Sequence, residues 1–272
     1  MDYIQQAIDK AREERQGNIG QSDSTDKPVT SNEPSKGQGD SKKGVPDSIN
    51  YTKTRQTQIS NQQLKDNRVI AGFSFEPAAE PYRQLRTQVL QKMRANDWKT
   101  LAITSPNENA GKSLTALNLA IALSQEVNQT VLLVDLDLRN PSILNLLSIE
   151  AEKGIVDHLR DEVSVSEILI NPGFDRLVIL PGVADPNYSS EILSSPAMKE
   201  LLEDLTSRYG SRIIIFDLPA LLVNDDALVF TPFVDSALLV VEDGVSTEED
   251  IQKSLMLLEG VNLMGSILNK AD

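Results

Sequence analysis

The stretch that decides the fold is TLAITSPNENAGKSLTALNLAIAL, residues 100–123. It begins with a short apolar run, continues through small and polar residues, and ends in leucines and alanines at helical spacing. A strand, a small-residue loop and a helix in this order form the setting of a phosphate-binding loop. We therefore predict that residues 104–113, which end in Gly111, Lys112 and Ser113, hold the phosphates of a nucleotide.

The loop departs from the G-x-x-x-x-G-K-[ST] pattern, whose first glycine would stand where this chain has Pro106. Asparagine tolerates the left-handed backbone region better than most residues, so we expect Asn109 to supply the conformation that glycine usually supplies. Backbone N–H groups and a helix N-terminus would then hold the phosphates, with a lysine on the outer phosphates and a hydroxyl on magnesium. Taken alone, GKS also fits an ordinary capped helix, and this alternative stays open.

Two further apolar runs end in aspartates. VLLVDLDLRNP, residues 131–141, contains Asp135 and Asp137, and RIIIFDLPA, residues 212–220, contains Asp217. A magnesium–triphosphate site needs carboxylates beside the hydroxyl-bound metal. Each aspartate alone could be a turn former or a helix cap, but three strands that all end in such residues favour one shared site.

These motifs predict a set of site residues. Lys112 would neutralise the outer phosphates, Ser113 would bind magnesium, and Asp217 would orient the metal's ligands. Asp135 and Asp137 would position a metal-bound water and the attacking oxygen. The expected catalytic residues are Lys112, Asp135, Asp137 and Asp217, the expected metal residues are Ser113, Asp135, Asp137 and Asp217, and the expected nucleotide-binding residues of the loop are Asn109, Ala110, Gly111, Lys112, Ser113 and Leu114.

Composition limits the classes of function. The chain has 272 residues, of which 40% are hydrophobic, enough for one substantial domain or two small ones. The absence of cysteine and the single histidine exclude disulfides, iron–sulfur clusters and multi-histidine sites, so any metal must be oxygen-bound, as magnesium is. No apolar run is long enough for a transmembrane segment, and the first residues are charged, so we expect a cytoplasmic protein.

Residues 1–70 hold 10 acidic and 11 basic side chains, so residues 71–272 hold 30 acidic and 15 basic ones and carry a net charge of −15, against a total of −14 for the whole chain. An acidic folded part argues against binding to nucleic acid or to an anionic membrane surface, because both depend on positive charge.

The sequence divides into three parts. Residues 1–15 carry isoleucines and alanines at helical spacing and predict a short amphipathic helix. Residues 16–67 are rich in Gln, Ser, Asp, Asn, Lys, Gly and Pro and predict a disordered linker. The helix could pack on its own domain, bind a partner through this tether, or lie on a membrane surface. Residues 68–272 are predicted to form the folded domain.

Runs of leucine and β-branched residues in the folded domain predict strands that are buried on both faces of a mostly parallel sheet. The strands are expected at residues 100–104, 130–135, 176–180, 212–217, 236–241 and 265–269, with helices at 112–125, 197–208 and 247–259. This pattern predicts a three-layer α/β domain with helices on both sides of the central sheet. Ligands bind beyond the carboxyl ends of strands in such sheets, where the motifs above fall.

Residues 78–272 resemble the cytoplasmic kinase domain of bacterial tyrosine autokinases, which are P-loop enzymes associated with capsule and exopolysaccharide export. The motifs that carry the resemblance are TSPNENAGKS, VLLVDLDLRNP, IIIFDLP, NYSSEILSS at 187–195, Asp226, the closing SILNK, and EPYRQLRTQV at 80–89. The resemblance implies the P-loop NTPase fold, ATP and Mg²⁺ as cofactors, and contact between Asn269 and the adenine. It also implies that Glu80, Arg83 and Arg86 mediate assembly of a homo-oligomeric ring.

The N-terminal helix and the polar linker resemble the exopolysaccharide branch of that family, in which the kinase is separate from its membrane-spanning partner. This implies recruitment to the inner face of the cell membrane by a polysaccharide chain-length or co-polymerase protein. Partitioning ATPases have an extra lysine early in the loop, which residues 104–110 lack, and iron–sulfur scaffold ATPases need cysteines. The ending NKAD, residues 269–272, also spells a guanine-binding motif, which remains an alternative.

The chain lacks the C-terminal tyrosine cluster of the family, and DLPA replaces the family's usual D-x-P-P. Its tyrosines are Tyr3, Tyr51, Tyr82, Tyr188 and Tyr209. Only Tyr3 and Tyr51 are expected in segments mobile enough to reach the active site of a neighbouring subunit. Two functions follow: an ATP-dependent tyrosine autokinase that regulates polysaccharide polymerisation and export, or a nucleotide-gated assembly factor that phosphorylates no tyrosine. The polymer, the identity of the partner and the ring size are left open.

Overall fold

The computed structural model describes residues 55–271, except 162 and 208–211. All of them belong to one compact unit, Gly44–Asp272. The predictions for the helix at 1–15 and for linker residues 16–54 lie outside the described residues.

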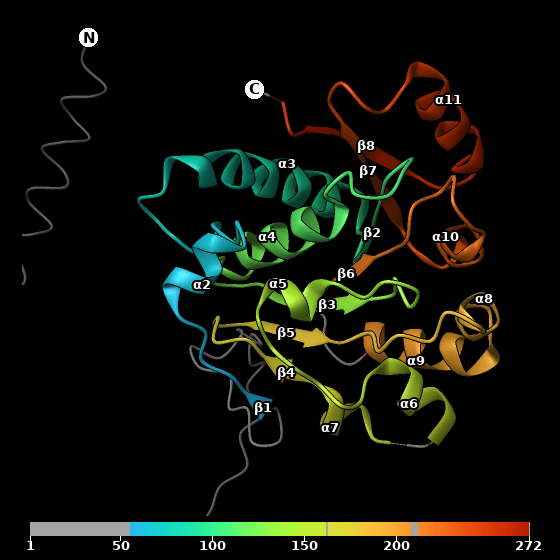
Figure 1. Ribbon diagram of the computed structural model, residues 1–272, viewed down its shortest axis with the longest axis horizontal. Coiled ribbons are helices and arrows are strands. Elements are labelled where there is room, and N and C mark those ends of the chain that lie inside the picture. The colour runs from blue at the N-terminus through green and yellow to red at the C-terminus, as the bar shows by residue number, and fades with distance from the viewer. Residues whose placement is uncertain (1–54, 162, 208–211, 272) are drawn as a thin grey trace, which may run out of the picture. The chain divides into compact units, whose positions relative to one another are not determined.

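An eight-stranded sheet forms the middle layer, in the order β1-β4-β5-β3-β6-β2-β7-β8 (Figure 1). Neighbouring strands run parallel except β4 and β5. The strands are β1 (Arg55–Gln56), β2 (Thr100–Thr104), β3 (Thr130–Asp135), β4 (Ile170–Asn171), β5 (Leu177–Leu180), β6 (Arg212–Asp217), β7 (Ser236–Glu242) and β8 (Leu263–Asn269).

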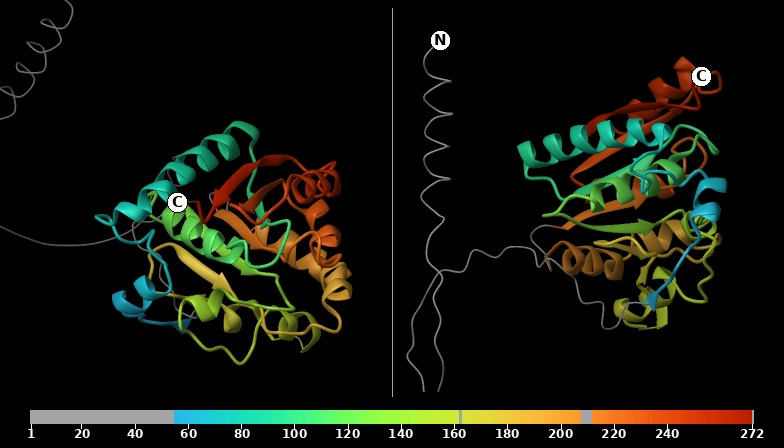
Figure 2. Two further views of the ribbon diagram at one scale, coloured as in Figure 1. Left: turned by 45° about the horizontal axis from the view of Figure 1, so that its top comes forward. Right: turned by 90° about the vertical axis from the view of Figure 1, so that its left-hand side faces the viewer.

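Helices cover both faces of the sheet (Figure 2). Two separate hydrophobic clusters show the division, because α2 to α5 contribute to one cluster and α6 to α11 to the other. The helices are α2 (Asn61–Asp66), α3 (Glu80–Asn96), α4 (Lys112–Ser124), α5 (Ile143–Leu146), α6 (Ile155–Asp161), α7 (Val165–Ile168), α8 (Ser189–Leu193), α9 (Pro196–Ser207), α10 (Asp226–Phe230) and α11 (Glu248–Leu257). The predicted three-layer α/β fold is confirmed, and each predicted strand and helix is present with its ends shifted by at most two residues.

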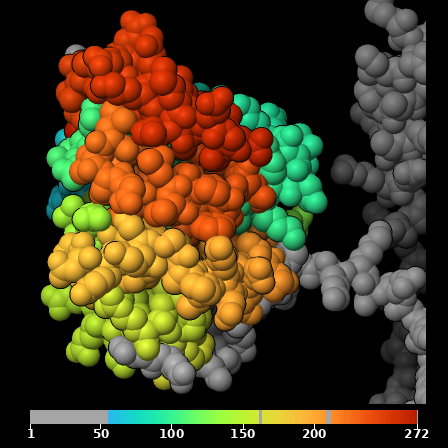
Figure 3. Space-filling view, turned by 90° about the vertical axis from the view of Figure 1, so that its right-hand side faces the viewer, coloured from blue at the N-terminus to red at the C-terminus, as the bar shows by residue number. Residues whose placement is uncertain are grey.

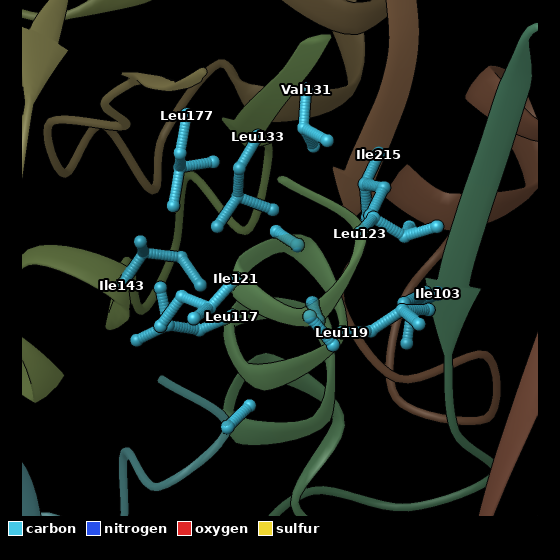
Figure 4. Close-up of a cluster of buried hydrophobic side chains, with 14 of the residues drawn as sticks. Ile103, Leu117, Leu119, Ile121, Leu123, Val131, Leu133, Ile143, Leu177 and Ile215 are labelled. Atoms are coloured by element: carbon cyan, nitrogen blue, oxygen red, sulfur yellow. The ribbon is translucent and has the colours of Figure 1, made fainter. Parts of the chain in front are cut away.

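Helix α4 lies against the centre of the sheet, which explains its apolar composition on nearly every side. Figure 4 shows side chains of α4 facing those of the strands across this interface. The labelled contacts involve Leu117, Leu119, Ile121 and Leu123 from α4, and Ile103, Val131, Leu133, Leu177 and Ile215 from the sheet. Strands β2 and β3 are buried throughout, as their unbroken apolar runs predict. This packing fixes the N-terminus of α4 at the carboxyl edge of β2.

The predicted domain boundary at residue 68 is corrected by the structure. Strand β1 pairs with β4, and Leu64 of α2 packs into the core with 5% of its surface exposed. Ser60 caps α2 in a reciprocal capping box with Gln63. The polar composition of this segment hid a two-residue edge strand and a helix that buries a single leucine.

Candidate functional site

The loop between β2 and α4 has the backbone of a phosphate cradle. Asn109 has φ 62° and Gly111 has φ 91°, so the asparagine takes the left-handed conformation expected of it. A side chain at position 111 is disfavoured by this φ, and its Cβ would lie 2.2 Å from Asn269 Nδ2, so Asn269 would have to move. Asn269 Nδ2 donates a hydrogen bond of 2.8 Å to the carbonyl oxygen of Ala110. The end of β8 therefore braces the loop from outside.

Lys112 begins α4 and points toward the aspartates at the ends of β3 and β6. Its Nζ lies 2.7 Å from Asp137 Oδ2, and both side chains are largely buried. Burial alone would lower the pKa of Lys112, but attraction to Asp217, Asp137 and Asp135 outweighs burial and raises that pKa. The lysine therefore keeps its charge inside the site.

Asp217 ends β6 and is fully buried. Neither of its carboxylate oxygens accepts a hydrogen bond of normal geometry from the described residues. Burial raises the pKa of Asp217 to about 6, against the opposing effects of Lys112 and Ser113. A buried acceptor without donors is costly, so this position is suited to waters or ligands that a bound metal would bring.

Asp135 is equally buried but well supplied with donors. Its Oδ2 accepts hydrogen bonds of 3.1 Å from the backbone N–H groups of Ser142 and Ile143, and its Oδ1 accepts one of 3.3 Å from that of Asp137. Burial, followed by repulsion from Asp217, nonetheless raises the pKa of Asp135 well above its usual value. Asp135 thus holds the segment after β3 in place as well as adding negative charge to the site.

A cavity of about 460 Å³ opens at the N-terminus of α4. It is lined by Glu108, Asn109, Gly111, Lys112, Ser113, Leu114, Asp137, Asn140, Ser142 and Leu146. A second cavity of about 550 Å³ adjoins it at Gly111 and Leu114 and reaches Asn269. The structure thus brings the predicted loop residues, three aspartates and Asn269 together at one edge of the sheet.

This arrangement fits the phosphates of a magnesium–nucleotide complex. The 13-residue helix α4 and Lys112 supply positive potential, and Ser113 offers a hydroxyl next to the unsatisfied Asp217. Within the described ranges, no group of three His, Cys, Asp or Glu side chains forms a metal cage of its own. Magnesium at Ser113 would accordingly take its other oxygens from phosphates and waters, as this ion usually does.

A second polar cluster lies beside this site, and sequence reasoning assigned it no role. Arg139 donates from Nε and Nη2 to Asp226, over 2.8 and 3.0 Å, and Ser190 donates to both Asp226 and Asp225. Burial would raise the pKa of Asp226, but the hydrogen bonds from Arg139 and Ser190 outweigh it and lower that pKa. Ser190 and Asp226 stand in motifs that carry the family resemblance, and Arg139 follows Asp137 by two residues, but none of these signals indicated that the three side chains pair.

The three residues expected in ring assembly lie on α3, away from the aspartates. Arg83 Nε pairs with Glu80 at 2.8 Å on the same helix, and Arg86 Nε lies 3.3 Å from Glu126. In this single chain their ion pairs are therefore internal, and their role in assembly stays a prediction.

Comparison with known proteins agrees with this geometry. A protein family described as "AAA domain" matches residues 98–257. Tyrosine-protein kinase etk of Escherichia coli (strain K12) is 32% identical over 220 residues, which cover 78% of this chain and 30% of that protein. Tyrosine-protein kinase YwqD of Bacillus subtilis (strain 168) is 31% identical, covering 70% of this chain and 80% of that one. Succinoglycan biosynthesis transport protein ExoP of Rhizobium meliloti (strain 1021) is 30% identical over a match that covers 76% of this chain and 26% of that protein.

Solved structures show the same fold. The kinase domain of Escherichia coli tyrosine kinase ETK superposes with a TM-score of 0.68 at 28% identity, covering 75% of this chain and 82% of that one. The septum site-determining protein MinD from Pyrococcus horikoshii OT3, complexed with Mg-ADP, superposes with a TM-score of 0.54 at 25% identity, covering 62% of this chain and 69% of that one.

The fold and the loop define this protein as a P-loop nucleotide-binding domain of the AAA type. Within that class, the chain belongs to the bacterial tyrosine-protein kinase family. It spans about a third of the length of the etk protein and most of YwqD. No helix in the described part of the chain is long and apolar enough to span a membrane.

Proposed function

We propose that this chain binds Mg-ATP and transfers the γ-phosphoryl group to tyrosine. The observation that carries the proposal is the pairing of Lys112 with Asp137 beside the unsatisfied carboxylate of Asp217, at the N-terminus of α4. An anionic ligand that draws Lys112 toward itself would release Asp137, and the waters of a bound cation would supply the hydrogen bonds that Asp217 lacks. Phosphates and a metal that enter together would bring about both changes.

Each residue then has a defined part. The backbone of Asn109–Leu114 would surround the phosphates, and Lys112 would balance the charge that develops on the transferred group. Ser113 would bind magnesium, with Asp217 orienting its waters. Asp135 and Asp137 would position the attacking oxygen and a metal-bound water, and Asn269, which already braces the loop, would lie beside the base.

The names of the relatives support a place in polysaccharide synthesis. ExoP is named as a succinoglycan biosynthesis transport protein, and we infer that this chain regulates polymerisation or export of an exopolysaccharide or capsule. It would act in the cytoplasm, recruited to the inner face of the membrane by a membrane-spanning co-polymerase. Glu80, Arg83 and Arg86 would exchange their internal ion pairs for pairs between subunits in a homo-oligomeric ring.

The test is phosphotyrosine mass spectrometry on the purified full-length chain, after phosphatase treatment and incubation with Mg-ATP. The proposal predicts new phosphotyrosine that depends on magnesium and is lost in Lys112→Met. ATP hydrolysis without phosphotyrosine, with or without the membrane partner, would instead support a nucleotide-gated assembly factor.

A further inference from the structure

The cavity at the N-terminus of α4 contains a carboxylate to which the site described above gives no role. Glu108 lines this cavity together with Gly111, Lys112 and Asp137. Its side chain is exposed, and it makes no ion pair or hydrogen bond with any residue of the described ranges. An unpaired negative side chain therefore faces the space in which the phosphates of a nucleotide are expected.

The loop holds Glu108 in this position. On its N-terminal side, Asn107 Nδ2 donates a hydrogen bond of 3.2 Å to Asp250 Oδ2 on α11, and Ser105 Oγ donates one of 2.7 Å to the carbonyl oxygen of Asn107. On its C-terminal side, Asn109 has the left-handed backbone conformation of the phosphate cradle. The backbone is fixed on both sides of Glu108, so a bound nucleotide would meet this carboxylate at the wall of the cavity.

The cavity supplies no positive charge to offset Glu108. Lys112 is the only cationic side chain among the described residues that line it. Its Nζ lies 2.7 Å from Asp137 Oδ2 and is also attracted to Asp135 and Asp217. One lysine thus already balances three aspartates, and the negative charge of Glu108 is additional.

This excess negative charge affects the two forms of a nucleotide differently. The repulsion between Glu108 and a ligand grows in proportion to the charge of the ligand. At pH 8, metal-free ADP carries a charge of about −3, whereas Mg-ADP carries about −1. Glu108 should therefore weaken binding of the metal-free form much more than binding of the magnesium-bound form.

We propose that Glu108 selects the magnesium-bound form of the nucleotide by repelling the metal-free form. The inference rests on the nucleotide site proposed above and adds a specificity-determining residue to it. Lys112 and the N-terminus of α4 attract the phosphates of either form, and Glu108 opposes the charge that no metal covers. Loss of magnesium after phosphoryl transfer would then speed the release of ADP.

Isothermal titration of the purified full-length chain with ADP tests the inference without turnover. One titration contains EDTA and the other excess MgCl2, at the same ionic strength of about 0.05 M, where charges interact over roughly 14 Å. In Glu108→Gln, affinity for metal-free ADP should rise about five- to tenfold, the effect of about three charges roughly 8 Å from a unit charge in a solvent-like dielectric. Affinity for Mg-ADP should rise by no more than about twofold, because its charge is about a third as large.

Reversal of the charge extends the series. Glu108→Lys changes the charge twice as much as Glu108→Gln, so affinity should rise about 25- to 100-fold for metal-free ADP and about three- to fivefold for Mg-ADP. At about 0.5 M salt the charges interact over only about 4 Å, and the gain in Glu108→Gln should fall below about twofold. A structural disturbance of the loop would instead lower both affinities at either salt concentration.

The matched control is Glu203→Gln, which removes an exposed carboxylate from α9 and should bind both forms of ADP as wild type does. Equal gains for the two forms in Glu108→Gln would overturn the inference and leave the nucleotide site in place. A loss of Mg-ADP affinity in Glu108→Gln would show that this carboxylate contacts the metal or the nucleotide, which also overturns it. If the wild-type chain binds neither form, the proposed nucleotide site is wrong as well.

Discussion

Two polar clusters lie at the carboxyl edge of the sheet, and they differ in whether their buried carboxylate accepts hydrogen bonds. In the cluster of Arg139, Asp226 and Ser190, both oxygens of the buried carboxylate accept strong hydrogen bonds, and the pKa of Asp226 is lowered. In the nucleotide site, Asp217 has no such donors, and its pKa is raised to about 6. Figure 3, which faces the right-hand side of Figure 1, shows the red and orange C-terminal segments above the gold and yellow-green ones.

The difference separates a structural pair from a binding site. A buried ion pair whose hydrogen bonds are all made contributes little net stability to the folded protein. Removal of one partner is strongly destabilising, because it leaves the other charge buried and unpaired. The aspartates of the nucleotide site repel one another around a single lysine, and this repulsion lowers the stability of the nucleotide-free protein. A bound divalent cation with phosphates would remove the repulsion. Changes in the two clusters should therefore affect stability in opposite directions.

The largest effect is expected from Lys112→Met. Removal of one preorganised charge from an active site typically costs 10²- to 10³-fold in rate, and Lys112 is the cation nearest to the three aspartates. Steady-state ATP turnover should therefore fall by at least about 100-fold. Lys253→Met, on the exposed face of α11, is the matched control and should retain wild-type turnover. Turnover within twofold of wild type in Lys112→Met would place the chemistry elsewhere.

Next is Asp217→Asn, which should stabilise the nucleotide-free protein. The pKa of Asp217 is raised in the folded state, so the ionised form is disfavoured there, and stability is lost as pH rises from about 4 through about 6. Above that range, a shift of two pKa units corresponds to about 3 kcal/mol. The substitution should recover up to this amount at pH 8 and nothing at pH 3.5.

Urea unfolding of the two proteins across this pH range measures the difference, and Mg-ATP titration should show weakened binding in Asp217→Asn. If Asp217→Asn lowers the free energy of unfolding at pH 8, the Asp217 carboxylate accepts stabilising hydrogen bonds in the folded protein, and the two clusters do not differ in this respect.

Arg139→Ala should act in the opposite direction. It leaves the Asp226 carboxylate buried without its bidentate partner, which we expect to cost about 2 kcal/mol, below the usual range for buried pairs because Arg139 is 35% exposed. The matched control is Arg160→Ala, whose pair with Asp185 is more exposed and should contribute less than about 1 kcal/mol. Equal losses in the two variants would mean that the Asp226 cluster is no more than a surface ion pair.

These clusters also mark the limits of sequence reasoning. The strands and α4 were predictable because burial on both faces leaves unbroken apolar runs, such as those of β2 and β3. The loop was predictable because its residues are consecutive. The bond from Asn269 to Ala110 and the pair of Arg139 with Asp226 join residues 159 and 87 positions apart, and no local pattern encodes such distances.

Short edge elements were harder still. Strand β1 has two exposed residues and α2 buries only Leu64, so their sequence has the polar composition of a linker. Both elements form through contacts with distant parts of the chain, because β1 pairs with β4 and Leu64 of α2 packs into the hydrophobic cluster around α4.

The smallest effect concerns the loop backbone at Asn109. Its φ of 62° is left-handed, where a Cβ costs roughly 1–2 kcal/mol in ordinary residues and glycine has no such cost. Asn109→Gly removes the strain but adds freedom to the unfolded chain, so the two contributions should nearly cancel in the unfolding free energy. Asn109→Ala keeps the Cβ without the local hydrogen bonding of asparagine and should lose about 1 kcal/mol. If Asn109 serves only through its backbone, Mg-ATP affinity in Asn109→Gly should also match wild type in an isothermal titration. A large loss of affinity in Asn109→Gly would instead show that the asparagine side chain contacts the nucleotide, and the loop would then differ from a glycine-rich cradle in chemistry as well as in sequence.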